Sequence, residues 1–284
     1  MSSQPSIYFC NGKYLPAHRA TISVHDLGLL RGFGLFEALR TYDGQPFLLK
    51  AHLDRLFHGA KAIGLKSPLT HSNFKKVITR LLRKNHFDES LIRIILTGGP
   101  SDGFLPQKKP TVVILVDPFH PFPSWQYQKG ISLMTAPAGR ILPEIKSTIY
   151  FAAVMQTMKA VRWGFTEVVY VDEQGALLEG TTYNVFAVLA GSRLVTPQNG
   201  ILAGITAACV LNIARRLHIP VLRKPITPRF LRQSKELFIT SSNRELISVI
   251  RVNHMRIGNG RPGPVTQQIH MAYQKLTQDL VKKS

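Results

Sequence analysis

Two segments near the middle of the chain decide its interpretation, Pro143-Glu144-Ile145-Lys146-Ser147-Thr148-Ile149-Tyr150 and Leu178-Glu179-Gly180-Thr181-Thr182-Tyr183-Asn184-Val185-Phe186. In the first, a lysine precedes small polar residues where a strand is expected to lead into a helix, a position that presents a side chain into a cleft. In the second, a glutamate ends an apolar strand and precedes a glycine. Surface lysines and turn carboxylates are common, so neither segment identifies a site by itself.

Two segments further along the chain supply groups that suit a phosphate. Gly204-Ile205-Thr206 opens a predicted helix, whose first-turn amides and dipole favour an anion; simple N-capping by Thr206 is the alternative. Ser241 and Ser242 follow an apolar strand and could add hydroxyl and amide donors, or form an exposed turn.

An early predicted helix carries Arg55, which could hold a phosphate as a planar fork or pair structurally with Asp54 or Glu37. Together with Lys146 and Glu179, these groups indicate an aldehyde cofactor with a phosphate tail. The lysine would hold the aldehyde and later act as a general base, and the glutamate would keep a proton on the cofactor ring.

The bulk composition is that of a soluble globular protein with one large or two moderate domains. The chain has 284 residues, of which 44% are hydrophobic and 18% charged. Its apolar runs are too short to span a membrane, and its beginning lacks the pattern of a signal peptide. Two cysteines, Cys10 and Cys209, cannot form a disulfide framework, so we expect a reduced, cytoplasmic setting.

The net charge of +20 raises the question of a nucleic-acid or membrane partner. The densest basic cluster, between Lys75 and Lys84, lies on a predicted amphipathic helix with no aromatic interleaving and no nucleic-acid-binding signature. We therefore expect solvated charge, no nucleic-acid and no membrane partner, and a surface that helps to steer anionic small substrates. No metal site is predicted.

The hydrophobic periodicity predicts a small N-terminal α+β domain over residues 1–118. Its predicted elements are a hairpin around Asn11-Gly12, a hairpin of 34–42 with 45–49, helices over 52–63 and 72–84, and strands over 90–96 and 111–116.

Prolines at 118, 121 and 123 predict a stiff connector, which we assign to residues 119–130. A larger domain is predicted over 131–284. Its predicted strands are 131–136, 167–171, 176–178, 185–189, 193–195, 221–222 and 236–240, and its helices are 149–163, 205–217, 228–233 and 265–281.

The ordered set of motifs resembles the class IV, or fold-type IV, pyridoxal-phosphate aminotransferases. This group includes branched-chain aminotransferases, D-amino-acid aminotransferases and aminodeoxychorismate lyase. The resemblance runs from about residue 6 to 275 and rests on 52–56, 146–147, 179–186, 196–197, 204–206, 240–242 and 260–266. It implies a two-domain α/β (α+β) fold, with a small N-terminal domain and a larger C-terminal domain built on a mixed sheet or barrel.

The resemblance also implies roles for individual residues. Lys146 would form the Schiff base with pyridoxal 5'-phosphate, Glu179 would face the ring nitrogen, and Tyr150 would lie near the phenolic oxygen. The phosphate would be held by Arg55, Ile205, Thr206, Ser241 and Ser242. Substrate contacts would come from Arg31, Phe36, Arg93 and Thr182.

Three positions depart from the family pattern. Ile149 stands where an asparagine is usual, Ala207 where an arginine is usual, and Arg31 where many relatives place a pocket tyrosine. Arg31 either adds a cation for a second carboxylate or points outward. These departures bear on the substrate more than on the cofactor.

The resemblance therefore predicts an aminotransferase that moves the amino group of an L-amino acid, first of all a branched-chain one, to 2-oxoglutarate, and works as a homodimer or larger. Tyr150, Arg93 and the absence of an Arg-x-His element favour branched-chain over D-amino acids. Aminodeoxychorismate lyase and D-amino-acid aminotransferase are the alternatives on the same fold, and a non-catalytic basic binding protein is the alternative in another class.

Overall fold

The N-terminal part of the chain contains two tight hairpin turns. Asn11 and Gly12 have φ of 46° and 89°, and Asp43 and Gly44 have φ of 49° and 70°. Left-handed backbone at both central residues matches the twist of a hairpin, and Asn-Gly and Asp-Gly adopt it readily. These turns connect β1 (Ile7–Cys10) with β2 (Lys13–Pro16) and β3 (Gly34–Tyr42) with β4 (Gln45–Pro46).

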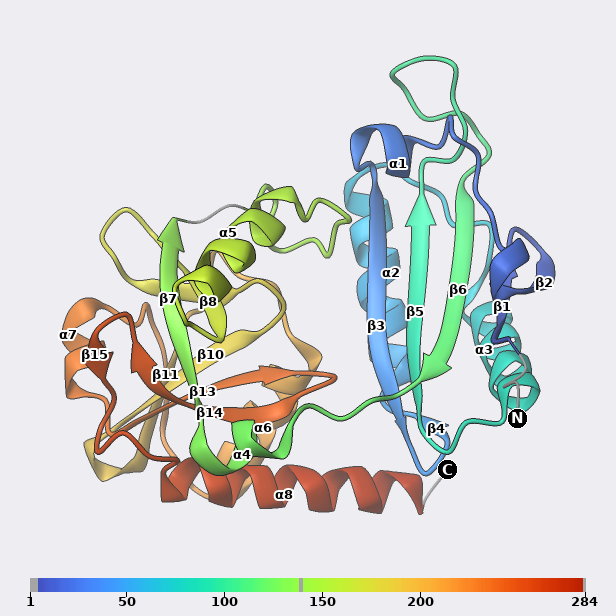
Figure 1. Cartoon of the computed structure of the whole chain (residues 1–284). Helices are drawn as coiled ribbons and strands as arrows, with labels where there is room; N and C mark the ends of the chain where they lie inside the picture. Colours follow the sequence, from blue (N-terminus) through green and yellow to red (C-terminus); the bar gives the residue numbers. More distant parts are fainter. Residues whose placement is uncertain (1–4, 138–139, 283–284) are drawn as a thin grey trace. The chain divides into compact units, whose positions relative to one another are not determined.

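The structure is a computed structural model that describes residues 5–137 and 140–282. They divide into two units (Figure 1). The first unit runs to His120 and includes Ile145–Ile149 and the end of the chain from Val281. The second comprises Pro121–Glu144 and Tyr150–Leu280. The first break falls in the proline-rich segment. The sequence predicted continuous domains, with Lys146 in the C-terminal domain. In the structure, the segment that contains Lys146 belongs to the first unit.

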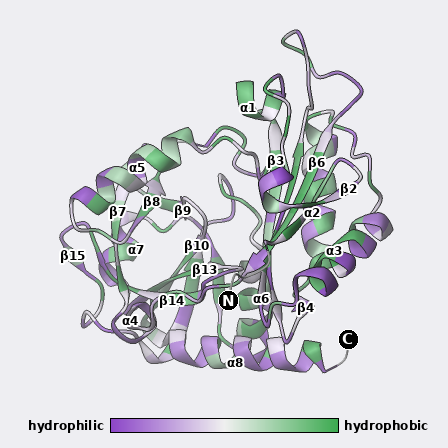
Figure 2. Ribbon diagram, turned by 45° about the vertical axis from the view of Figure 1, so that its right-hand side comes forward, coloured by the Kyte–Doolittle hydropathy of each residue, from purple (hydrophilic) through white to green (hydrophobic). Residues whose placement is uncertain are grey.

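The first unit is a six-stranded antiparallel sheet with the order β2-β1-β6-β5-β3-β4. Helices α2 and α3 pack on the sheet (Figure 1) and bury one apolar core with its strands. Figure 2 colours much of the ribbon of these strands as hydrophobic. The remaining elements are β5 (Ser90–Thr97), β6 (Thr111–Pro118), α1 (Leu27–Arg31), α2 (Leu49–Ala62), α3 (His71–Asn85) and a 3-10 turn (Ala17–Arg19).

The second unit contains a nine-stranded mixed sheet with the order β12-β11-β10-β13-β14-β7-β8-β9, to which β15 adds beside β14. Because β9 also pairs with β10, six of these strands close into a barrel. Its strands are β7 (Ile131–Pro137), β8 (Glu167–Val171), β9 (Leu177–Gly180), β10 (Asn184–Leu189), β13 (Glu236–Ser241) and β14 (Glu245–Val252).

Short elements and helices surround this barrel. Strand β10 is buried along its whole length, as expected of a strand covered on both faces. The elements outside the barrel are β11 (Arg193–Thr196), β12 (Val221–Arg223), β15 (Met255–Arg256), α4 (Ser124–Lys129), α5 (Phe151–Arg162), α6 (Ile205–Arg216), α7 (Pro228–Gln233), α8 (Pro264–Val281) and a 3-10 turn (Ala190–Ser192).

The expected elements are present, with the following differences. Strand β4 has two residues, because α2 starts at Leu49, three residues earlier than predicted. Helix α4 lies inside the segment assigned as a connector, and α1 has five residues; both are too short for helical periodicity to show. Strands β14 and β15 were not predicted. Among the described residues, no helix is long and apolar enough to cross a membrane.

Candidate active site

Lys146 lies in a segment that continues the sheet of the first unit beside β3. The Phe36 amide donates to the Lys146 carbonyl at 3.0 Å, and the Thr148 amide donates to the Gly34 carbonyl at 2.9 Å. The Thr148 hydroxyl also donates to the carbonyl of Gly32 at 2.8 Å. The backbone on both sides of Lys146 is thus fixed, although this segment belongs to no regular strand.

The side chain of Lys146 lies against Phe36, with Nζ 4.4 Å from the centre of the ring. Along β3, Phe36 alternates with the buried residues Leu35 and Glu37, which belong to the face covered by the helices. Phe36 therefore lies on the opposite face of the sheet, and Lys146 lies there with it. The structure thus brings together two residues predicted from the sequence, one as catalytic and one as substrate-binding.

Arg55 is bound to Glu37 in a two-point contact. Its Nε donates to Oε1 at 2.8 Å and its Nη2 to Oε2 at 2.7 Å. His52 Nδ1 also lies 2.8 Å from Oε2, and both His52 and Glu37 are buried. Of the two structural partners considered from the sequence, the observed one is Glu37, since Asp54 contacts Lys50 and His71 instead.

This buried cluster shifts two pKa values. Burial alone raises the pKa of Glu37, but the hydrogen bonds from Arg55 and His52 outweigh it and lower the value to about 2. Burial lowers the pKa of His52, although the Glu37 carboxylate acts in the opposite direction. Glu37 is therefore an anion near neutral pH, and its charge orients Arg55.

Two arginines predicted to contact substrate already have partners. Arg93 Nη2 donates to Oδ2 of Asp117 at 2.6 Å. Arg31 ends α1, is exposed, donates to the Leu30 carbonyl at 2.9 Å and stacks over Phe104 at 5.7 Å from the ring centre. Arg31 thus lies on the surface, at the end of a short helix where a loop was expected.

In the second unit, Glu179 begins a polar row that crosses three strands. Glu179 on β9 pairs with Asn184 on β10, and Asn184 pairs with Thr240 on β13. Residues directly opposite one another in antiparallel strands point to the same face. The row therefore presents a carboxylate, an amide and a hydroxyl on one face of the barrel sheet.

Glu179 is held by donors on both carboxylate oxygens. Arg140 Nη1 donates to Oε1 at 2.7 Å, and the Leu202 amide donates to Oε2 at 3.0 Å. Asn184 Nδ2 in turn donates to the Leu202 carbonyl at 2.9 Å. Leu202 therefore links the polar row to the loop that leads into α6.

The start of α6 lies against the same row. Gly204 is the N-cap residue, so Thr206 is the second residue of the helix and does not cap it. A Cβ atom on Gly204 would lie 1.8 Å from Oδ1 of Asn184, which explains why glycine occupies this position. Ile205 and Thr206 thus supply first-turn backbone amides, and Thr206 is buried.

The turn after β13 carries the two predicted serines. The Ser241 hydroxyl accepts a hydrogen bond from the Arg244 amide at 3.3 Å, which closes the turn. Just before it, the buried Thr240 hydroxyl has no hydrogen-bond partner among the described residues. Tyr150, the remaining predicted cofactor contact, is the N-cap residue of α5.

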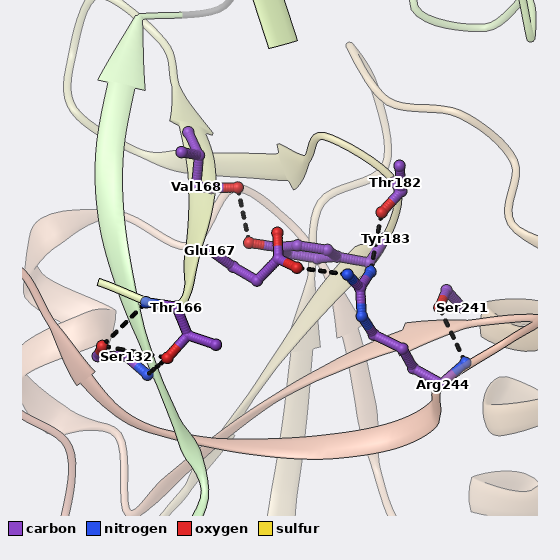
Figure 3. A network of polar contacts seen from close by, with 8 residues as sticks. All are labelled: Ser132, Thr166, Glu167, Val168, Thr182, Tyr183, Ser241 and Arg244. Carbon is purple, nitrogen blue, oxygen red and sulfur yellow. Dashed lines mark hydrogen bonds and ion pairs between the residues drawn. The ribbon is translucent and has the colours of Figure 1, made fainter. Parts of the chain in front are cut away.

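Several residues around these sites were not singled out from the sequence. Asn184 was quoted within a motif but given no role, and nothing in the spacing of Arg140, Leu202 or Arg244 distinguishes them from other residues of their type. Arg244 joins Thr182, Glu167 and the Ser241 turn in one network (Figure 3). These residues lie near the predicted site residues only because of the register in which the strands pair and the course that the loops take.

Comparisons with known proteins agree on one family. The profile described as amino-transferase class IV matches residues 34–252. A protein of Methanocaldococcus jannaschii named "Putative branched-chain-amino-acid aminotransferase" is 34% identical over 92% of this chain and 93% of its own length. A D-alanine aminotransferase of Staphylococcus epidermidis is 28% identical over 95% of this chain and 97% of its own.

Solved structures share the whole architecture. The branched-chain aminotransferase of Thermoproteus uzoniensis with norvaline is 28% identical, covers 95% of this chain and 94% of its own, and has a TM-score of 0.87. The "T.th." branched-chain enzyme with pyridoxamine 5'-phosphate is 26% identical, covers 96% and 94%, and has a TM-score of 0.89. With the family profile spanning most of both units, this chain belongs to the class IV aminotransferases, which are pyridoxal-phosphate enzymes.

Proposed function

We propose that this aminotransferase binds pyridoxal 5'-phosphate and moves the amino group of a branched-chain L-amino acid to 2-oxoglutarate. The observation that carries the proposal is the polar row Glu179–Asn184–Thr240 together with the start of α6. A carboxylate suits a protonated pyridine nitrogen, and first-turn amides suit a phosphate. The buried Thr240 hydroxyl, which has no hydrogen-bond partner within 5–137 and 140–282, is a further polar group available on this face.

When bound, pyridoxal phosphate supplies an electron sink for the charge that develops at the α-carbon of the amino donor. We assign Lys146 to hold the cofactor aldehyde and to carry the proton to and from that carbon. Glu179 keeps the ring nitrogen protonated. The fixed backbone around Lys146 and the two donors on Glu179 support these roles, because both limit how far the functional groups can move.

The phosphate contacts are assigned to the first-turn amides of Ile205 and Thr206, to Ser241 and Ser242, and to Arg55. Glu37 orients the Arg55 guanidinium through two hydrogen bonds. Tyr150 is assigned to the phenolic oxygen of the cofactor. An arginine whose charge is already matched by a buried carboxylate acts here mainly as an oriented donor.

For the substrate we assign Phe36 as an apolar wall beside Lys146, and Arg93, Thr182 and Arg31 as further contacts. Phe36 supports an apolar donor, because its ring lies directly against the lysine side chain. The Asp117 carboxylate already balances the charge of Arg93. To bind a substrate carboxylate, Arg93 would therefore have to divide its hydrogen bonds between Asp117 and the substrate. Arg31 would bind a second carboxylate on the substrate only after its side chain moves away from the Phe104 ring.

A donor panel with 2-oxoglutarate tests the substrate proposal. We expect leucine, isoleucine or valine to react well above D-alanine. Strong D-alanine activity would instead support the function named for the staphylococcal relatives. Pyruvate release from aminodeoxychorismate without any transamination would indicate the lyase, and binding of DNA or RNA with no cofactor uptake would indicate a non-catalytic protein.

We also propose that the enzyme is a homodimer or larger. Helix α5 exposes one apolar stripe, which Figure 2 shows as hydrophobic segments of its ribbon. The spacing of these residues places them on one side of the helix. A contiguous exposed stripe of this kind is typical of an interface. Its members are Phe151, Val154, Met155, Met158 and Val161.

A further inference from the structure

Arg244 occupies the turn between β13 and β14, and its side chain reaches two other segments (Figure 3). Nη1 donates to the Thr182 hydroxyl at 2.8 Å, and Nη2 donates to Oε1 of Glu167. Its backbone is held as well: the amide donates to Ser241 Oγ, and the carbonyl accepts from the Tyr127 hydroxyl at 3.2 Å. One residue thus ties its own turn to three other parts of the chain.

The guanidinium of Arg244 is nearly enclosed. Its side chain and that of Glu167 are each 13% exposed, and its central carbon lies 4.5 Å from the ring centre of Phe122. Burial raises the pKa of Glu167, while the nearby Arg244 works against that rise. Each charge is therefore compensated by the other, and the aromatic ring covers the guanidinium.

This compensation decides which role Arg244 can have. A cation matched by a buried carboxylate adds little net attraction for an anionic substrate. Its directional hydrogen bonds, however, fix the positions of the groups that they join. Two of these groups belong to segments assigned to ligands, namely Thr182 to the substrate and the Ser241 turn to the cofactor phosphate.

We propose that Arg244 is a positioning residue, which holds the Thr182 hydroxyl and the Ser241–Asn243 turn in the geometry that binds substrate and cofactor phosphate. The inference rests on the proposed function, because that function assigns Thr182 to the substrate and the Ser241 turn to the cofactor phosphate. The network itself lies wholly within the second unit.

The test compares Arg244→Met with Arg251→Met. Methionine keeps an unbranched chain against Phe122 but removes every guanidinium hydrogen bond. Arg251, on β14, is the matched control, because it is an exposed arginine stacked over a different ring, Phe165, at 5.0 Å. In the apo proteins, hydrogen exchange should quicken in 181–183 and 241–244 for Arg244→Met and stay unchanged for Arg251→Met. Unchanged exchange in both variants would overturn the proposal.

Ligand measurements on the same variants separate positioning from chemistry. Arg244→Met should raise the Kd for pyridoxal phosphate, measured by equilibrium titration, by about tenfold, as expected for loss of a charge-assisted hydrogen bond. It should raise the KM for the amino donor by a similar factor while kcat at saturating cofactor stays within about twofold. A fall in kcat with unchanged Kd and KM would overturn the assignment.

A double-mutant cycle tests whether Arg244 acts through Thr182. Thr182→Val should raise KM in the wild-type background but add nothing in the Arg244→Met background, whereas independent residues would give additive effects. If Arg244→Met does not fold because Glu167 is left unpaired, the variant with Glu167→Gln added removes that charge and serves in its place. Wild-type protein that takes up no pyridoxal phosphate would refute the proposed function, while the exchange experiment on apo protein would still decide the role of Arg244.

Discussion

Arg140 donates a hydrogen bond from Nη1 to Oε1 of Glu179 at 2.7 Å, and the two side chains are only 13% and 4% exposed. The arginine therefore compensates and orients the carboxylate that we assign to the cofactor ring. The Leu202 amide holds the other oxygen. The proposed function of Glu179 thus depends on a residue that the sequence motifs do not include.

Glu179→Gln should keep the fold and lower kcat by roughly 10²-fold, about 3 kcal/mol of barrier, because a neutral amide does not hold a proton on the ring nitrogen. Arg140→Gln should lower kcat less, by about tenfold, since the Leu202 amide still orients the carboxylate. Steady-state kinetics with the best donor checks both. Near wild-type turnover in Glu179→Gln would remove its assigned role.

Borohydride reduction of the protein with pyridoxal phosphate should label Lys146, which peptide mass mapping can locate. Lys146→Ala should still bind the cofactor but lose most of its turnover, because the covalent and the proton-transfer roles both disappear. Lys159 is a matched control, since its Nζ also lies over an aromatic ring, at 4.6 Å from the centre of Trp163. A pyridoxyl label on Lys159, or on any lysine other than Lys146, would refute the assignment.

Arg55→Ala should raise the Kd for pyridoxal phosphate by about one to two decades, in line with the loss of a charge-assisted pair. Saturating cofactor should restore much of the rate, because the reacting groups are unchanged. Cofactor titration followed by kinetics measures both effects. Unchanged affinity would leave Arg55 with only its structural role beside Glu37.

The Glu37 cluster should make folding stability depend on pH. Because the pKa of Glu37 is lowered from 4.5 to about 2 in the folded protein, its contribution is fully present above pH 4.5 and is lost as the pH falls through 2. The difference corresponds to about 3 kcal/mol. His52, whose pKa is lowered by burial, acts in the same direction once the pH falls below its unfolded value of 6.5.

Denaturant titrations between pH 7 and 3 check this dependence. Glu37→Gln should lower the free energy of unfolding at neutral pH and flatten its decline toward acid, since the titrating carboxylate is gone. A variant of the exposed Asp102, Asp102→Asn, should leave the slope close to that of the wild type. An equally steep decline in Glu37→Gln would show that other groups cause the acid sensitivity.

Val154→Glu or Met158→Glu should shift the protein toward monomer, because a charge in the apolar stripe of α5 opposes its burial against a second copy. Lys159→Glu changes the charge of an exposed residue outside the stripe and should keep the wild-type mass. Light scattering coupled to size exclusion gives the mass of each. An unchanged assembly in both stripe variants would place the interface elsewhere.

Local chemistry made much of the architecture readable from the sequence. The Asn11-Gly12 and Asp43-Gly44 turns specify hairpins through their backbone preferences, and the apolar spacing in α2 and α3 specifies the core-facing sides of those helices. The ordered motifs around Lys146 and Glu179 identified the family that the comparisons confirm. These signals depend on residues that are close together in the sequence, so they can be recognised without knowledge of the tertiary structure.

Tertiary structure alone decided which groups surround the predicted residues. The Glu179–Asn184–Thr240 row exists because β9, β10 and β13 pair in one register, although Thr240 lies far along the chain from Glu179. The contacts of Arg140 and Leu202 with Glu179, and of Arg244 with Thr182 and Glu167, depend on loop paths that carry no periodic signal. Sequence thus determined most of the elements and the family, whereas long-range strand pairing and loop packing determined the environment of each functional group.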